Sequence, residues 1–264
     1  MALTKPEGAV MTNPFASSHS KIARAKEHFA ELEKRVKAFV DLNPCKEITE
    51  DDPSRPGFKV FKVKLTEPLP EAVGNILGDL VGNLRSALDT TAYAIAVASG
   101  KTNPKNTAFP FAGSVSQMAN ALGRAKDLPK EIHSLFCGFQ PYLGGDDLLW
   151  LLNEICVSDK HKIVTPLVAG ILPILRRDVS ATEGFLSAPQ APTWDSAKNE
   201  MEVLTFGPGT QFQYHFQFHL FVAFQNVPLV SEKPILPILD NLFGKIERIL
   251  TAMEWESRRL GIVK

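Results

Sequence analysis

Hydrophobic residues recur every three to four positions in three long segments of the chain, and this spacing predicts three amphipathic helices. The first begins after a serine cap at Ser18 or Ser20 and continues to about Asp41, and the last covers residues 237–259. Each helix needs a surface that covers its apolar stripe. We therefore expect the first and the last helices to pack against each other.

The middle helix is predicted between Pro70 and Gly100, because proline favours the first turn of a helix and glycine ends one. Its apolar stripe comprises Leu77, Leu80, Val81, Leu84, Leu88, Ala92 and Ile95. Shorter helices are expected at 115–125 and 129–138, and the segment "LLWLLNEICVSDKHK" predicts another at 148–162.

Alternation of apolar and polar residues indicates strands in two regions. The segment "FKVFKVKL" (58–65) reads as a strand with one solvent face, and its alternation slips between Val60 and Phe61, which is typical of a β-bulge. From 163 to 225 the pattern is again β, most clearly in "QYHFQFHLFVAFQ" (213–225), with "EVLTF" (202–206) as its expected partner. The proline-rich segment 43–57 predicts a turn.

The predicted elements follow the order helix, strand, several helices, several strands and helix. This order lacks the regular alternation that indicates a parallel sheet. We therefore predict an α+β fold, in which a helical bundle core packs against an antiparallel β-sheet. Residues 1–18 predict a disordered tail, and residues 19–264 suit a single domain.

The chain carries 29 Lys and Arg residues against 29 Asp and Glu residues, so its formal net charge is zero. Nucleic-acid binders usually have a basic excess, so the composition allows nucleic acid as a partner without favouring it. The three cysteines are too few for a disulfide framework, which fits a cytoplasmic protein. The N-terminus lacks a signal-peptide pattern, and no apolar run of about 18 residues occurs, so no membrane association is predicted.

Three polar residues lie in the centre of the middle helix. Arg85 is at the edge of the apolar stripe, Asp89 is one turn further on, and Asn83 is on the far side. One interpretation is an Arg85–Asp89 pair at the helix surface, worth about 0.3 kcal/mol. The other is that Arg85 points into a partly buried polar site that Asn83 and Asp89 help to form.

The helix predicted at 148–162 supports the second interpretation. If its period continues, Asp159 lies in the centre of the apolar face, where a carboxylate needs a partner, and Arg85 is the simplest one. If the helix ends near Ser158, Asp159 lies in a turn instead. The following Lys160 and His161 belong to "DKHK", in which two lysines flank a histidine and would form a small anion site.

Several segments resemble, in order, a family of uncharacterised bacterial proteins. They are "GDLVGNLRSALD" (78–89), "FPF" (109–111), "QPYLGG" (140–145) and "LLNEICVSDKHKIV" (151–164). That family pairs an "H-N-L-R-S-A-L-D-H" helix with a later "D-K-H" motif, and the likeness extends over residues 20–165. Its "R-S-A-L-D-H" also has the R-x4-H pattern of HEPN helical domains. Many of these are metal-independent ribonucleases of toxin and antiviral systems, in which Arg and His act on the ribose 2′-hydroxyl and the phosphorane, often across a dimer interface.

The resemblance implies that Arg85 is the arginine of this pattern, but Gly82 and Thr90 occupy the two histidine positions. A threonine hydroxyl does not titrate near pH 7, so Thr90 cannot act as the general base. We therefore predict a non-catalytic binding or interaction protein with a polar pocket around Arg85 and Asp159, linked to a bacterial defence or toxin-type system. The alternative is a metal-independent ribonuclease or phosphotransfer enzyme that uses Arg85 and His161.

No cofactor or metal is predicted. His133 and Cys137 have the spacing of half a zinc site, but no second pair accompanies them. The expected partner is an unknown protein or a small anionic ligand, and the resemblance also allows a homodimer.

Overall fold

The computed structural model describes residues 13–158, 169–174, 180–187, 194–195, 197–213, 217–225 and 227–264. The chain divides into two compact units. The first, here called the helical unit, contains residues up to His28 together with 79–157 and 240–264. The second, called the sheet unit, contains residues 29–78 and 158–239. That residues 19–264 form a single domain stays a prediction.

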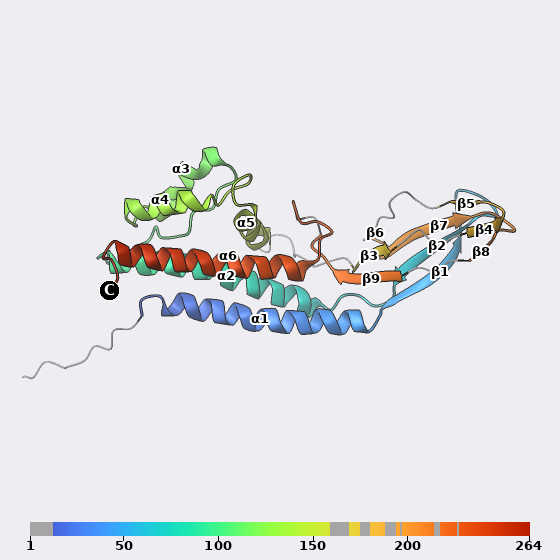
Figure 1. The fold of residues 1–264 in the computed structure, drawn as a ribbon, viewed down its shortest axis with the longest axis horizontal. Coiled ribbons are helices and arrows are strands. Elements are labelled where there is room, and N and C mark those ends of the chain that lie inside the picture. The colour runs from blue at the N-terminus through green and yellow to red at the C-terminus, as the bar shows by residue number, and fades with distance from the viewer. Residues whose placement is uncertain are drawn as a thin grey trace, which may run out of the picture. The chain divides into compact units, whose positions relative to one another are not determined.

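Three long helices form the framework of the helical unit, and each continues into the sheet unit (Figure 1). They are α1 (Ala16–Asp41), α2 (Glu71–Ala98) and α6 (Ile235–Arg259). Two side-chain contacts join α1 to α6 in antiparallel order: His19 Nε2 lies 2.8 Å from Glu254 Oε1, and Lys26 Nζ forms an ion pair with Glu247 Oε1 at 2.6 Å. The predicted packing of the first helix against the last is therefore confirmed in this unit.

The N-terminus of α1 differs from the prediction. The helix begins at Ala16, after Asn13, whose Oδ1 accepts a hydrogen bond from the Phe15 N–H at 3.0 Å. Ser18 therefore lies inside the helix and is fully buried, and its hydroxyl lies 3.1 Å from the Thr90 hydroxyl of α2. The predicted cap at Ser18 or Ser20 was wrong, because the helix begins at Ala16, before both serines.

The apolar stripe of α2 is buried as predicted, since none of its seven side chains is more than 1% exposed. The helix ends at Ala98, and Gly100 follows with φ of +89°, a conformation that glycine adopts without strain. The position of α2 and the residues of its core face are thus confirmed.

The remaining helices of this unit lie between α2 and α6 in the chain (Figure 1). The 115–125 region consists of a short α-helix, α3 (Met118–Ala121), between two 3-10 turns at Val115–Gln117 and Leu122–Ala125. It is followed by α4 (Lys130–Phe139) and α5 (Asp147–Ser158). Asp146 caps α5 by accepting the Leu149 N–H at 3.1 Å, and its second oxygen pairs with Lys245 of α6.

The main sheet of the sheet unit is antiparallel, in the order β1-β2-β7-β5, with β6 also paired to β7. These strands are β1 (Cys45–Asp51), β2 (Lys59–Leu65), β5 (Leu186–Ser187), β6 (Trp194–Asp195) and β7 (Glu200–Phe206). Separate two-stranded pairs are formed by β3 (Ala169–Ile174) with β9 (Gln217–Val222) and by β4 (Ser180–Glu183) with β8 (Gln211–Gln213).

The prediction of a turn over 43–57 was wrong in part, because Cys45–Asp51 forms the edge strand β1. Its charged side chains suit an edge, where one side of the strand remains in water. The prediction that "EVLTF" pairs with the 213–225 strand was also wrong, since in the described pairings β7 joins β2 and β9 joins β3. The bulge in β2 is confirmed, with the register shift between Phe61 and Lys62.

Lys62 follows the bulge, between Phe61 and Val63 of the sheet core, and its side chain is only 11% exposed. Its ammonium group lies 2.9 Å from Glu200 Oε1, 3.0 Å from Glu50 Oε2 and 3.9 Å from Glu202 Oε1. The hydrogen bond to Glu200 raises the pKa of Lys62. The largely buried cation is thus shared by carboxylates from both neighbouring strands.

These elements confirm the α+β class, with long helices and antiparallel strands in separate stretches of the chain. None of the helices in the described part of the chain is both long and apolar enough to cross a lipid bilayer.

Candidate functional site

Arg85 lies in the helical unit, where α2 faces α5 and the segment after α2. Its guanidinium donates a short hydrogen bond to Asn153 Oδ1 of α5, and its Cζ lies 4.7 Å from the centroid of the Phe111 ring. The side chain is half-buried, and no carboxylate of the described residues forms a salt bridge with it. A guanidinium has five N–H donors, so the contacts to Asn153 and Phe111 leave donors for a further acceptor.

Asp89 helps to place the Phe111 ring. Its Oδ1 accepts the N–H of Phe109 at 2.8 Å, which fixes the "FPF" segment against α2. Phe109 is 1% exposed, and its ring lies 5.0 Å from the rings of both Phe111 and Phe136. The position of Phe111 beneath the guanidinium therefore follows from the anchoring of Phe109. We call Arg85, Asp89, Phe111 and Asn153 the Arg85 cluster.

Burial raises the pKa of the Asp89 carboxyl, and this effect outweighs the opposing influence of the Phe109 N–H and of the nearby Arg85 and Arg124 guanidinium groups. The surface Arg85–Asp89 salt bridge considered from the sequence is not formed, because each side chain uses a partner outside α2. The structure thus favours a partly buried polar cluster, in which the two charged groups act on each other without direct contact.

The motif segments of the helical unit meet at this cluster. The "FPF" segment continues into Ala112, whose N–H donates to the Pro141 carbonyl of "QPYLGG" at 3.0 Å. A Cβ atom at Gly145 would lie 2.7 Å from the Gln140 carbonyl oxygen, so the turn before α5 requires glycine there. This turn leads directly into α5, which carries Asn153, and each segment therefore helps to position a part of the cluster.

Asn83 does not belong to the cluster. Its Nδ2 donates to the Asp79 carbonyl at 2.8 Å, within α2 itself. Asn83 and Arg85 are two residues apart, which corresponds to about 200° around a helix, so they face nearly opposite sides. The amide of Asn83 is thus satisfied locally, and the structure does not bring it to Arg85.

Thr90, at the position where the resemblance implies a histidine, also faces away from Arg85. Its hydroxyl donates to the Ser86 carbonyl at 2.8 Å and lies beside the Ser18 hydroxyl of α1. Five residues correspond to about 140° around a straight helix. A side chain at this position therefore meets α1, whereas Arg85 meets α5.

Asp159, Lys160 and His161 lie outside the described residues, directly after the end of α5 at Ser158. The predicted Arg85–Asp159 salt bridge and the anion site at "DKHK" stay predictions. What the structure does show is the contact of Arg85 with α5, through Asn153 rather than through a carboxylate. Sequence reasoning missed Asn153, although it is the only polar residue between Leu148 and Glu154.

His133, which with Cys137 has the spacing of half a zinc site, contacts a backbone carbonyl. The His133 Nε2 lies 2.8 Å from the Ala125 carbonyl, which ties α4 to the preceding turn. Within the described ranges, no three His, Cys, Asp or Glu residues are grouped so that they could hold a metal ion.

Comparisons of the chain with protein-family models, with curated proteins and with solved structures find no match. The resemblance drawn from the sequence motifs therefore stays a prediction.

Proposed function

We propose that this protein is a non-catalytic binding protein whose Arg85 cluster holds an anionic group of a small ligand or of a partner protein. The observation that carries this proposal is a half-buried guanidinium held by a neutral amide and an aromatic ring, with no carboxylate bound to it among the described residues. A cation in such a place is stabilised by an anion that completes its hydrogen bonds.

The chemistry of the cluster favours a carboxylate or a monoanionic phosphate ester as the ligand. A guanidinium binds both through two parallel N–H donors. Asp89 lies close enough to Arg85 to influence it electrostatically, so a second negative charge on the ligand is unfavourable there. Protonation of Asp89, which its burial promotes, reduces this repulsion.

Asp159 and Lys160 remain part of the proposed site, because they follow α5 directly and α5 already supplies Asn153. In this proposal the anion of the ligand competes with Asp159 for the N–H donors of Arg85. In this proposal Lys160 adds a second cation near the ligand. The proposed cytoplasmic setting rests on the small number of cysteines, and the proposed link to a bacterial defence or toxin-type system rests on the motif resemblance.

The proposal is tested by titrating the isotope-labelled chain with acetate and with inorganic phosphate, followed by NMR. We expect saturable shifts of the Arg85 Nε–H, the Asn153 side-chain amide and the Phe109 N–H, with a Kd on the order of 1 mM for such small probes. Arg85→Gln should abolish these shifts. Arg24→Gln is the matched control, because Arg24 is an exposed arginine whose salt-bridge partner among the described residues is Glu27, three residues away on the same helix.

Two outcomes would contradict the proposal. Shifts that increase without saturation would indicate a general salt effect, and saturable shifts that persist in Arg85→Gln would place the anion elsewhere. Arg85→Lys separates charge from geometry, since lysine keeps the charge but cannot form two parallel hydrogen bonds.

A further inference from the structure

Basic side chains are concentrated in residues 101–130, which lie between α2 and α4 in the chain. This segment contains five basic residues and one acidic residue, whereas the rest of the chain has 24 basic and 28 acidic residues. All five basic side chains are exposed, and none of them forms a salt bridge with a residue in the described part of the chain. They are Lys101, Lys105, Arg124, Lys126 and Lys130, and the acidic residue is Asp127. The segment thus carries a local positive charge although the chain as a whole is neutral.

Hydrogen bonds hold the two basic parts of this segment side by side. The Asp127 carboxylate accepts the Lys105 N–H at 2.9 Å, and the Ala108 N–H donates to the Arg124 carbonyl at 3.0 Å. Hydrogen bonds from backbone N–H groups lower the pKa of Asp127, and the nearby Lys101 ammonium lowers it further. The five cations therefore belong to one region of the helical unit, which we call the basic surface.

The basic surface borders the Arg85 cluster. The Phe109 N–H binds Asp89 of the cluster, and the preceding residue, Ala108, binds the carbonyl of Arg124. The Arg124 guanidinium also lies close enough to Asp89 to oppose the rise in the pKa of that carboxyl that burial causes. A chain of anionic groups that places one group at Arg85 can therefore place the next groups on Arg124 and the lysines.

We propose that the basic surface binds an acidic segment of a partner protein, and that one carboxylate of this segment is held by the Arg85 cluster. The inference rests on the proposed function and names the class of partner. Successive acidic side chains of a peptide present separate single charges, which suits cations that are distributed along a surface. The second carboxylate then lies beyond Asp89 and avoids the repulsion at the cluster itself.

A nucleic acid fits this surface less well. Proteins that bind single strands use exposed aromatic rings on which the bases stack. The aromatic residues of the segment, Phe109 and Phe111, are only 1% and 6% exposed, whereas Val115 is 68% exposed and offers an apolar contact to a peptide side chain. A long polyanion would also extend over the rest of the chain, where acidic residues exceed basic ones.

The test measures the fluorescence anisotropy of two labelled probes in the presence of the full chain. The probes are a hexaglutamate peptide and an oligothymidylate of the same charge. We expect the peptide to bind more tightly, and its affinity to fall as added salt screens the charges. A variant that combines Lys101→Gln, Lys105→Gln and Lys126→Gln should bind the peptide about eight-fold more weakly, because each exposed ion pair contributes about two-fold to the affinity.

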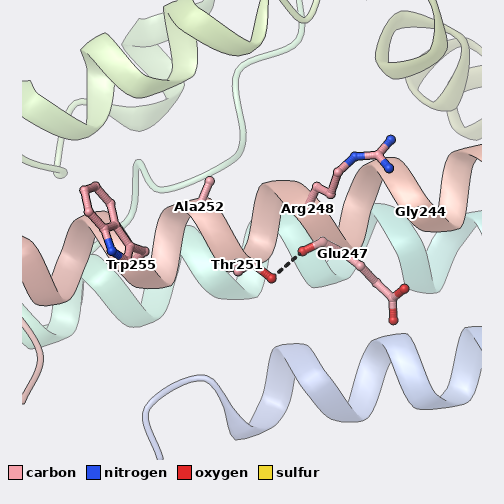
Figure 2. Close-up of a pocket in the computed structure, with 6 residues that line it drawn as sticks. All are labelled: Gly244, Glu247, Arg248, Thr251, Ala252 and Trp255. Carbon is pink, nitrogen blue, oxygen red and sulfur yellow. Dashed lines mark hydrogen bonds between the residues drawn. The ribbon is translucent and has the colours of Figure 1, made fainter.

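The matched control removes three cations from other parts of the chain. Lys34→Gln, Lys46→Gln and Arg248→Gln change the net charge equally, and these side chains are also exposed, with no described carboxylate within salt-bridge distance. Arg248 extends from α6, where it lines a pocket with Trp255 and other residues of the same helix (Figure 2). The control variant should bind the peptide like the parent. Equal weakening by both triple variants would indicate a general effect of charge and would overturn the proposal.

Acetate binding separates this proposal from the proposed function. The variant without the three lysines of the basic surface keeps Arg85, so its saturable acetate shifts should persist while its peptide affinity falls. A parent chain that binds acetate but not the peptide would overturn the acidic partner and leave the proposed function intact, and a chain that binds neither would overturn both. Tighter binding of the oligothymidylate than of the peptide would also overturn the proposal and would assign the basic surface to a nucleic acid.

Discussion

The buried carboxylate of Asp89 leads to a prediction about stability and pH. Asp89→Ala leaves the Phe109 N–H without its acceptor, and a buried donor without a partner costs about 1–3 kcal/mol. Asp89→Asn keeps an oxygen in the same place and removes only the charge. The comparison of these two variants therefore separates the hydrogen bond from the ionisation.

The sign of the pH effect follows from the direction of the pKa change. Because burial raises the pKa of Asp89, the folded chain holds this proton more tightly than the unfolded chain does. The resulting stability is complete below the usual Asp pKa of about 4 and is lost as the pH rises through the raised value. The free energy of unfolding of the parent chain should thus fall, relative to Asp89→Asn, as the pH rises from about 4 towards neutrality.

The assay is urea unfolding of both proteins at several pH values between about 3 and 7. Asp127→Asn is the control with the opposite sign. The Asp127 carboxylate accepts the N–H groups of Asn106 and Lys105, and these hydrogen bonds lower its pKa. Its contribution is present above the usual Asp pKa and is lost as the pH falls through the lowered value. If the unfolding free energy of the parent minus that of Asp89→Asn is constant, or increases with pH, the reasoning is refuted.

Three further predictions concern Arg85, the C-terminal helix and catalysis. Arg85→Ala removes the Phe111 contact and the Asn153 hydrogen bond, so it should lower the free energy of unfolding by about 2 kcal/mol. An effect below about 0.5 kcal/mol in a urea melt would mean that these contacts do not stabilise the fold. Deletion of residues 237–264 removes five or more buried apolar side chains, and the burial of each contributes about 1.5–3 kcal/mol to stability. The deletion should therefore abolish cooperative unfolding. A truncated chain that melts like the parent would contradict the packing of α6. The purified chain should not cleave labelled single-stranded RNA in EDTA; cleavage that is lost in both Arg85→Ala and His161→Ala would instead establish the ribonuclease alternative.

The helices could be predicted from the sequence because their information is local. A period of 3.6 in apolar residues identifies both the helix and its buried face, and the stripe of α2 was recovered in full. The site was recovered in part: Arg85 and Asp89 stood out as polar residues in an apolar helix, and both prove to bind groups outside α2. Asn153 did not stand out, since an amide carries no charge that demands a partner.

The strands were harder to predict because their partners are distant in the chain. β1 consists of "CKEITED", whose side chains are mostly exposed and do not alternate in burial, and it becomes a strand through pairing with β2. The pairing of β2 with β7 joins residues more than 130 positions apart, and no local sequence pattern predicts this pairing. Similarly, the contact of Phe111 with Arg85 depends on the hydrogen bond from the Phe109 N–H to Asp89, which lies twenty residues earlier in the chain.

The bulged strand β2 has a consequence for how the sheet selects its register. Residues 58–63 read "FKVFKV", so a slip of three positions would place Lys59 where Lys62 lies and would recreate the ion pair with Glu200. The repeat ends at Lys64, whose counterpart after the slip is Phe61, and Lys64 Nζ lies 3.8 Å from Glu200. The same slip would place Pro56 at the position of Lys59 and Gly57 at the buried position of Val60. The alignment is therefore selected at both ends of the repeat, by Lys64 and by the Pro56-Gly57 pair, more than by the better-paired Lys62. Lys64→Phe alone should thus keep a single set of NMR signals from β1 and β2, and two slowly exchanging sets would show that Lys64 selects the alignment by itself.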